Sequence, residues 1–138
     1  MSSNFYSVGL NHVGAYQVSG VPYITGSNLP STNTESLRFE FPNVTRRIII
    51  NTDCNHGIRV HWAPYTASFG YSDGAQTNNN FILVDSNHSV EFDVKCKEVF
   101  ISAVNGGDST HSVQVYAELT NIPASRMFDL DGRSGVNT

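Results

Sequence analysis

The chain has 138 residues and a net charge of −4, enough length for one domain with a core of its own. Only 14% of its residues are charged, whereas globular proteins typically have about 25%. Arg46-Arg47 is too short for the basic patch that nucleic-acid binding requires. No stretch approaches the roughly 20 apolar residues of a membrane span, and no signal peptide is recognisable. We therefore expect neither nucleic acid nor membrane as a partner.

Residues 1–34 contain no Asp, Glu, Lys or Arg, and the first charged residue is Glu35. A solvated surface normally carries mixed charge, and a disordered tail is normally charged and poor in aromatic residues. We therefore expect 1–34 to be an extended arm that lies against its own domain or a neighbour; the alternative is the first hairpin of an ordinary domain. The residues expected to contact a partner are Phe5, Tyr6, Val8, Leu10, Tyr16, Val18 and Tyr23.

From residue 35 to residue 122, apolar and polar residues alternate in short runs separated by turn residues such as Asp53–Gly57 and Asp85–Asn87. Strict alternation is typical of half-buried strands, and the run 81–84 predicts a more deeply covered one. Seven such runs predict an all-β domain, either an antiparallel β-sandwich or a jelly roll. The predicted strands span 36–41, 47–51, 58–62, 81–84, 90–95, 98–103 and 113–119.

A long turn-rich segment, 63–80, follows the third predicted strand. The aromatic residues around it either stack on sugars and anchor a protein interface, or pack the loop itself. These residues are Trp62, Tyr65, Phe69 and Tyr71. After the last predicted strand, residues 123–138 form a short tail in which Met127 and Phe128 are expected to contact a partner.

His56 and His61 lie five residues apart, with Asp53 and Cys54 close by, which superficially suggests a metal site. In a strand, however, His61 shares a face with Arg59, an unfavourable neighbour for a cation, and no second ligand pair has metal-site spacing. We therefore expect turn and surface histidines and no metal.

Two acidic patterns in the sequence resemble chemical sites. The segment 129–132 resembles a fragment of a calcium loop but lacks the remaining oxygen ligands, so an acidic turn is expected. Glu91 and Asp93 share one strand face, the minimum for glycoside hydrolysis, but Lys95 follows on the same face and a solvated surface explains all three. Nucleophile elbows, P-loops and dinucleotide fingerprints are absent from the sequence. The sequence therefore predicts no enzyme and no cofactor.

The two cysteines, Cys54 and Cys96, either pair with each other or remain buried thiols. Nothing else in the sequence suggests an oxidising compartment, which favours buried thiols.

Several segments distributed along the chain share the texture of one group of viral proteins: Asn4–Asn11, Gly14–Gly20, Phe39–Pro42, Glu91–Glu98 and Ala117–Pro123. In these segments the chain resembles a family of small virion structural proteins of marine tailed bacteriophages, of the cyanophage type. The resemblance implies a capsid decoration or cement protein on the capsid surface of the virion, assembled in the host cytoplasm. Its implied partners are the major capsid protein or other virion proteins, and further copies of itself, for instance in a trimer.

The residues favour a similar function by a separate argument. A low-charge β-sandwich with an uncharged arm suits a cementing subunit, because an arm can add strands to exposed sheet edges and many copies bind multivalently. The alternative is a neck or tail component, or a receptor-binding or glycan-binding module that uses the aromatic loop.

Overall fold

The structure is a computed structural model that describes residues 10, 20–29, 36–54, 56–63, 71–72, 75–76, 81–104, 111–130 and 136, with the backbone alone at 71–72 and 75–76. Within these residues the protein is all-β, with ten strands and one 3₁₀ turn. The elements are β1 (Val21–Asn28), β2 (Ser36–Glu40), β3 (Asn43–Thr52), β4 (Ile58–His61), β5 (Tyr71–Ser72), β6 (Ala75–Gln76), β7 (Ile82–Val84), β8 (Ser89–Phe92), β9 (Glu98–Ala103), β10 (Ser112–Pro123) and η2 (Ala124–Arg126).

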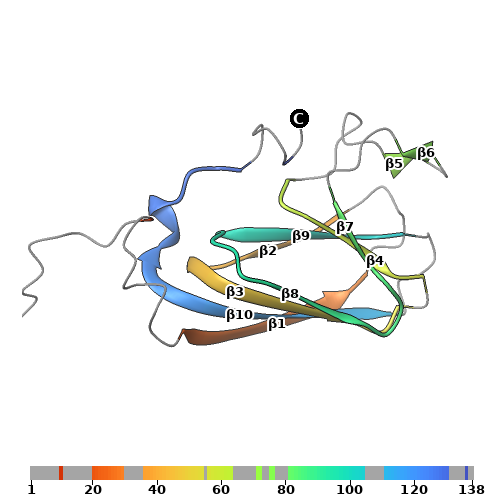
Figure 1. Ribbon diagram of the computed structural model, residues 1–138, viewed down its shortest axis with the longest axis horizontal. Coiled ribbons are helices and arrows are strands. Elements are labelled where there is room, and N and C mark those ends of the chain that lie inside the picture. Colours follow the sequence, from red (N-terminus) through yellow and green to blue (C-terminus); the bar gives the residue numbers. More distant parts are fainter. Residues whose placement is uncertain are drawn as a thin grey trace, which may run out of the picture.

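Eight of the strands form two four-stranded antiparallel sheets, and β5 and β6 form a small hairpin. The first sheet has the order β1-β10-β3-β8 and the second has the order β2-β9-β4-β7. Figure 1 shows the two sheets as separate layers. The pairs are nested along the chain: β1 pairs with β10, β2 with β9, β3 with β8 and β4 with β7. Successive nested pairs alternate between the two sheets.

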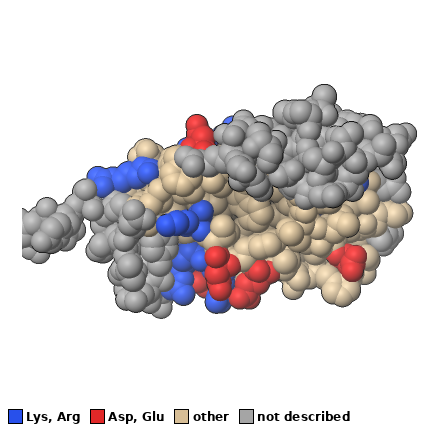
Figure 2. Space-filling view, turned by 45° about the horizontal axis from the view of Figure 1, so that its top comes forward, with Lys and Arg blue, Asp and Glu red and all other residues tan. Residues whose placement is uncertain are grey.

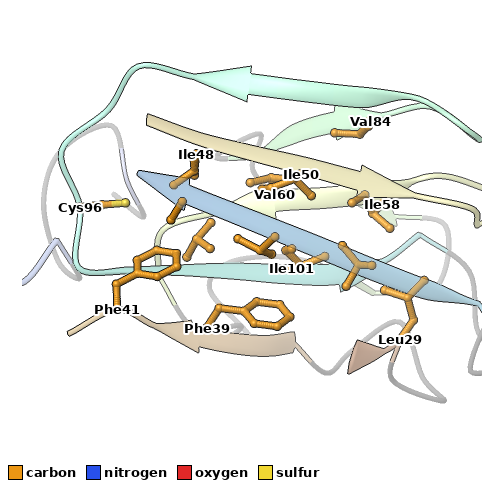
Figure 3. Packing of buried hydrophobic residues seen from close by; sticks show 14 of the residues in the cluster. Leu29, Phe39, Phe41, Ile48, Ile50, Ile58, Val60, Val84, Cys96 and Ile101 are labelled. Carbon is orange, nitrogen blue, oxygen red and sulfur yellow. The ribbon is translucent and has the colours of Figure 1, made fainter. Parts of the chain in front are cut away.

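One hydrophobic cluster takes residues from both sheets, and Figure 3 shows its side chains pointing toward one another. Ile48 and Ile50 of β3 come from the first sheet, and Val60 of β4 and Ile101 of β9 come from the second. All four side chains are fully buried. Because the buried faces of the two sheets share this cluster, removal of apolar surface from water holds the layers together.

The second sheet is covered on both faces near its centre. Val99, Phe100, Ile101, Ser102 and Ala103 of β9 are all buried, although the sequence alternation predicts that Phe100 and Ser102 face outward. Val99, Ile101 and Ala103, the residues predicted to face inward, are buried as expected. On the other face, the ring of Phe100 stacks on the ring of His61, which is also buried.

The structure corrects the expectation for residues 81–84. Of β7, only Val84 is buried, whereas Ile82 is 47% exposed and Leu83 is 60% exposed. The strand pairs with β4 at the end of the strand order of the second sheet, so its outer side lacks the cover that a central strand receives. An apolar run alone does not distinguish an edge strand from a central one.

Both predicted boundaries of the domain differ from the strand limits. The expected arm, 1–34, includes all of β1, which pairs with β10 over its whole length from Val21↔Leu119 to Asn28↔Ser112. The expected tail begins at the last residue of β10, Pro123, and continues into η2. Alternation extends weakly into β1, where only Tyr23 and Thr25 are half-buried, and so the charge boundary at residue 35 is not a structural one.

Two predicted turns are present where the sequence places them. Gly57 has φ +81° and its amide donates to the carbonyl of Cys54, which closes the turn before β4. Asn87 has φ +57° in the turn where the amide of His88 donates to the carbonyl of Asp85. Glycine and asparagine are the residues that tolerate this left-handed region.

Candidate interaction surface

The first strand forms one edge of the first sheet and carries no charged side chain. Its sequence is VPYITGSN, and six of its eight residues are exposed. Val21 is 64% exposed and Ile24 is 75% exposed, so two large apolar side chains lie in solvent on one strand. Figure 1 shows β1 alongside β10 at the border of this sheet. An uncharged edge strand with exposed apolar side chains is a template for pairing with another chain.

Backbone hydrogen bonds to β10 determine which groups of β1 face away from the sheet. The amide of Leu29 donates to the carbonyl of His111 at 3.0 Å, which extends the β1–β10 register by one residue. In an antiparallel ladder, alternate residues direct both backbone groups to the partner strand, and the residues between them direct both groups away. The backbone N–H and C=O groups of the even-numbered residues of β1 therefore point away from β10. Pro22, which has no N–H, falls in this outward set, where it removes no bond to β10.

The outer face of the first sheet continues from β1 across a row of aligned side chains. Ile24 pairs with Tyr116 of β10, and Tyr116 pairs with Ile49 of β3. The phenol of Tyr116 donates to the Glu118 carboxylate at 3.2 Å, and its pKa is raised by desolvation and by the Glu118 charge. The apolar row is thus continuous from the edge strand to the middle of the sheet.

Charged residues border this row and neutralise one another. Arg46 lies 3.3 Å from Glu118, and Arg47 lies 2.9 Å from Asp93 and 3.5 Å from Glu91. The hydrogen bond to Asp93, followed by the charge of Glu91, raises the pKa of Arg47. Figure 2 shows basic and acidic side chains next to one another along the lower border of this view. A hollow of about 400 Å³ here is lined by Arg46, Arg47, Asp93, Val94 and Lys95.

Because both arginines in this hollow meet carboxylates, the hollow does not present the one-signed surface that a polyanion requires. Exposed ion pairs of this kind contribute little to stability, because water and salt screen the charges. The charged group therefore borders the apolar row without offering the one-signed surface of a polyanion site.

A second hollow, of about 520 Å³, lies at the beginning of β1. Its lining is mostly apolar and is shared by β1, the start of β3 and the end of β10. The lining residues are Val21, Pro22, Tyr23, Pro42, Asn43, Leu119, Thr120 and Asn121. Because Val21 and Pro22 belong to β1, this hollow is continuous with the edge strand. We call β1 together with this hollow the β1 edge surface.

The other three sheet edges differ from β1. The edge strand β2 carries Arg38 and Glu40, with Arg38 lying 2.6 Å from Glu98, and the edge strand β8 carries Glu91. Charged side chains on an edge strand hinder pairing with another chain. The edge strand β7 is uncharged but has only three residues. Among the four edge strands of the two four-stranded sheets, as far as the structure describes them, β1 is therefore the longest uncharged one.

Of the arm residues predicted to contact a partner, Leu10 and Tyr23 are among the residues that the structure describes. Leu10 packs against the cluster of Val44, Ile122 and Met127, and its carbonyl accepts from the Lys95 ammonium at 3.3 Å. Tyr23 meets the ring of Phe41 edge-on at 5.7 Å. Both residues thus contact their own chain. The other five, Phe5, Tyr6, Val8, Tyr16 and Val18, lie outside the described residues.

The aromatic loop residues do not behave as one group. Trp62 packs against the main hydrophobic cluster and meets the ring of Phe92 edge-on at 5.2 Å, so it contributes to the core. Tyr71 begins β5, where the structure describes the backbone alone, and Tyr65 and Phe69 lie outside the described residues. In the tail, Met127 is buried with Val44 and Ile122, whereas Phe128 is 44% exposed.

The expectation that the histidines lie in turns or on the surface is wrong for His61, which is fully buried. Its Nδ1 lies 2.7 Å from the carbonyl of Ala63 and therefore carries the proton, so Nε2 accepts from the Ser102 hydroxyl. The ring stacks on Phe100 at 5.9 Å. Burial lowers the pKa of His61 to about 4, and the charge of Arg59 acts in the same direction.

A serine bonded to a histidine is also the core of a hydrolase dyad. Here both side chains are fully buried, and a nucleophile needs access to its substrate. The pair therefore satisfies buried polar groups within the described part of the second sheet. The sequence signal that could identify this His61–Ser102 pair is a small polar residue, Ser102, on the strand β9, which pairs with the strand β4 that carries His61.

The thiols of Cys54 and Cys96 are both buried and form no disulfide, in agreement with the favoured sequence interpretation. The hydroxyl of Thr45 lies 3.3 Å from the Cys96 sulfur and 2.7 Å from the carbonyl of Val94. Burial raises the pKa of the Cys96 thiol, which disfavours the reactive thiolate.

The described residues contain no group of three or more His, Cys, Asp or Glu side chains placed to hold a metal ion. Within the same residues, no helix is long and apolar enough to cross a membrane. By its fold the chain is an all-β protein with two four-stranded antiparallel sheets. Comparisons with protein-family models, with curated proteins and with solved structures gave no match.

Proposed function

We propose that this protein is a non-enzymatic structural component of a tailed-bacteriophage virion, most specifically a capsid decoration or cement protein on the capsid surface. We also propose that its two sheets form a β-sandwich of the jelly-roll type. In this role the protein binds the major capsid protein or another virion protein, assembles in the host cytoplasm and forms homo-oligomers.

The observation that carries the proposal is the nested pairing of the strands. A jelly roll is a long hairpin rolled into two sheets, so its first strand pairs with its last and its second with its penultimate. The pairs β1·β10, β2·β9, β3·β8 and β4·β7 follow this order and alternate between the sheets. Viral capsid and lectin domains are among the proteins that use the jelly roll. The order therefore supports the resemblance to virion proteins from an independent direction.

The β1 edge surface supports a role in assembly. It combines an uncharged eight-residue edge strand with an apolar hollow of about 520 Å³. Proteins normally protect such edges with charges, as β2 and β8 do here. An edge that lacks this protection suits a subunit whose task is to join neighbours, because the added strand supplies main-chain hydrogen bonds to the assembly.

The copy number of the protein in purified particles tests the proposal. Quantitative mass spectrometry of virions measures its ratio to the major capsid protein. A ratio comparable to one supports a decoration or cement protein, because a cementing subunit must occupy most lattice positions to act multivalently. A ratio near that of the tail proteins would assign the protein to the neck or tail and would refute the capsid assignment. Complete absence from particles refutes the virion proposal.

The glycan-binding alternative predicts that a sugar is bound through the aromatic loop. Trp62 packs on the core, so its replacement would disturb the fold as well as any binding. Tyr65→Ala is the cleaner variant for glycan-array measurements. Retained incorporation into particles together with lost glycan binding would favour a receptor-binding module over a cement protein.

A further inference from the structure

We infer that the β1 edge surface binds a second copy of this chain, with the two β1 strands pairing antiparallel about a two-fold axis at Thr25. This arrangement joins the four-stranded first sheets of both copies into one continuous sheet. It is an isologous contact, in which the same strand supplies both halves of the interface. The inference rests on the homo-oligomer part of the proposed function and not on the location of the protein in a virion.

The position of the axis follows from the backbone of β1. Pro22, Ile24, Gly26 and Asn28 direct their backbone groups away from β10, as the register and the Leu29 hydrogen bond require. An axis at Thr25 places Ile24 opposite Gly26 of the second copy and Pro22 opposite Asn28. All four outward-facing residues then obtain a partner. The missing N–H of Pro22 falls at the two ends of the new ladder, where its loss is least disruptive.

Side-chain shape favours the same register. Ile24 projects from the outer face of the sheet and is 75% exposed, whereas Gly26 offers no side chain beside it. In the paired strands, each Ile24 lies over Gly26 of the other copy. The Ile24–Tyr116–Ile49 rows of the two copies then meet across the axis and bury apolar surface that is exposed in one copy.

Close packing accounts for glycine at position 26 within the single copy. A Cβ at Gly26 would lie 2.8 Å from the carbonyl oxygen of Val113, so a larger residue would push β1 away from β10. The same glycine therefore allows β1 to pair closely with β10 and leaves room for Ile24 of the second copy.

Charge favours an identical strand as the occupant. The strand β1 has no charged residue, so two copies bring no like charges into opposition along the new ladder. The nearest ion pair, Arg46 with Glu118, lies beside the Pro22 end of the strand and is internally neutral. In the antiparallel arrangement this pair faces the uncharged Asn28 end of the second copy. No opposite-charged partner is needed to complement the edge.

Disulfide trapping tests the register directly. In the inferred pair, Thr25 faces Thr25 of the second copy at a position without mutual hydrogen bonds, where Cα atoms are about 4.5 Å apart and a disulfide fits. Thr25→Cys should therefore give a covalent dimer under mild oxidation. Val21→Cys is the matched control, because the two copies of residue 21 would be roughly 26 Å apart along the strands. The native thiols Cys54 and Cys96 are buried in both variants.

Edge charge tests the association without a cross-link. Sedimentation equilibrium of the wild-type chain should show a monomer–dimer equilibrium. Ile24→Lys should weaken the dimer by at least about tenfold, because lysine on an edge strand opposes pairing. Ser89→Lys, on the exposed β8 edge of the same sheet, is the matched control and should leave the dimer unchanged. Circular dichroism and thermal unfolding confirm that both variants are folded.

Three results would overturn the inference: a wild-type chain that stays monomeric, an Ile24→Lys variant that dimerises as the control does, or cross-linking at residue 21 in place of residue 25. These measurements use purified protein without capsids. Their failure would leave the copy-number test of the virion role unaffected, and absence from particles would leave the dimer inference unaffected.

Discussion

The buried histidine of the second sheet gives the most quantitative prediction. His61 is neutral in the folded protein, where burial lowers its pKa from the ordinary value of 6.5 to about 4. Because the unfolded chain binds a proton near pH 6.5 and the folded chain does not, unfolding takes up a proton between these two values. The contribution of His61 to stability is therefore fully present above pH 6.5 and is lost as the pH falls toward about 4.

The magnitude follows from the separation of the two pKa values. Each unit of separation corresponds to 1.36 kcal/mol, so the full loss is roughly 3 kcal/mol and the loss at pH 5 is about 2 kcal/mol. Small domains are stable by only about 5–15 kcal/mol, so this loss is a substantial fraction of the total. The Ala63 carbonyl opposes the shift, but desolvation outweighs it because the ring is fully buried.

Urea unfolding from pH 7.5 down to pH 4.5 measures the effect in the wild type and in His61→Gln. Glutamine does not titrate but can still accept from Ser102 and donate to the Ala63 carbonyl. The difference in unfolding free energy between the two proteins removes the titration of other groups, and it should shrink as the pH falls. Parallel curves would refute the reasoning. Ser102→Ala retains the titrating ring and should keep the pH dependence, which makes the test independent of whether His61→Gln folds.

Three further changes test the packing and the surface, each by chemical denaturation near neutral pH. Trp62→Ala should lower the unfolding free energy by at least about 2 kcal/mol, because the indole packs on the core; an unchanged midpoint would place the ring outside the core. Gly57→Ala should cost about 1–3 kcal/mol, since φ is +81° and a Cβ would lie 2.5 Å from the Val84 carbonyl oxygen. Arg47→Ala should leave the denaturation midpoint close to that of the wild type despite its two carboxylate neighbours, and a clear downward shift of the midpoint would show that these ion pairs are more than surface contacts.

The sequence predicts the strands of the core well because their pattern has a direct physical cause. A side chain at every second position faces one side of a strand, so burial of one face produces alternation. The runs around Ile48, Ile58, Val99 and Val113 all become strands of the two sheets. The strand around Val90 follows the same rule on a shorter scale.

The sequence failed where burial comes from outside the strand itself. His61 and Ser102 belong to the strand face predicted to be solvated, yet both side chains are fully buried. Strand β1 lacks strong alternation because it is an exposed edge, with only Tyr23 and Thr25 half-buried. Edge position and outside coverage depend on strand order, which local pattern does not encode.

The candidate interaction surface lies within a segment that the sequence analysis singles out. The absence of charge in 1–34 marks this segment, which includes β1, because uncharged segments of this kind are unusual on a solvated surface; its contact with a partner stays a prediction. The sequence did not identify Ile24, since its exposure depends on which side of β1 faces solvent. Likewise, Trp62 lies next to an aromatic, turn-rich segment that is typical of a binding loop, and its contact with Phe92 shows that it belongs to the core.

The nested order of the strands also has a consequence for how the chain is made. Val21 pairs with Leu119, roughly 100 residues later, and such distant pairing slows folding. Strand β1 is synthesised before β10, with about 80 residues between the two strands. During translation both edges of β1 therefore stay unpaired until this intervening segment and β10 have been made. An unpaired uncharged strand is prone to aggregation, so chaperone binding to β1 would protect the nascent chain during this interval.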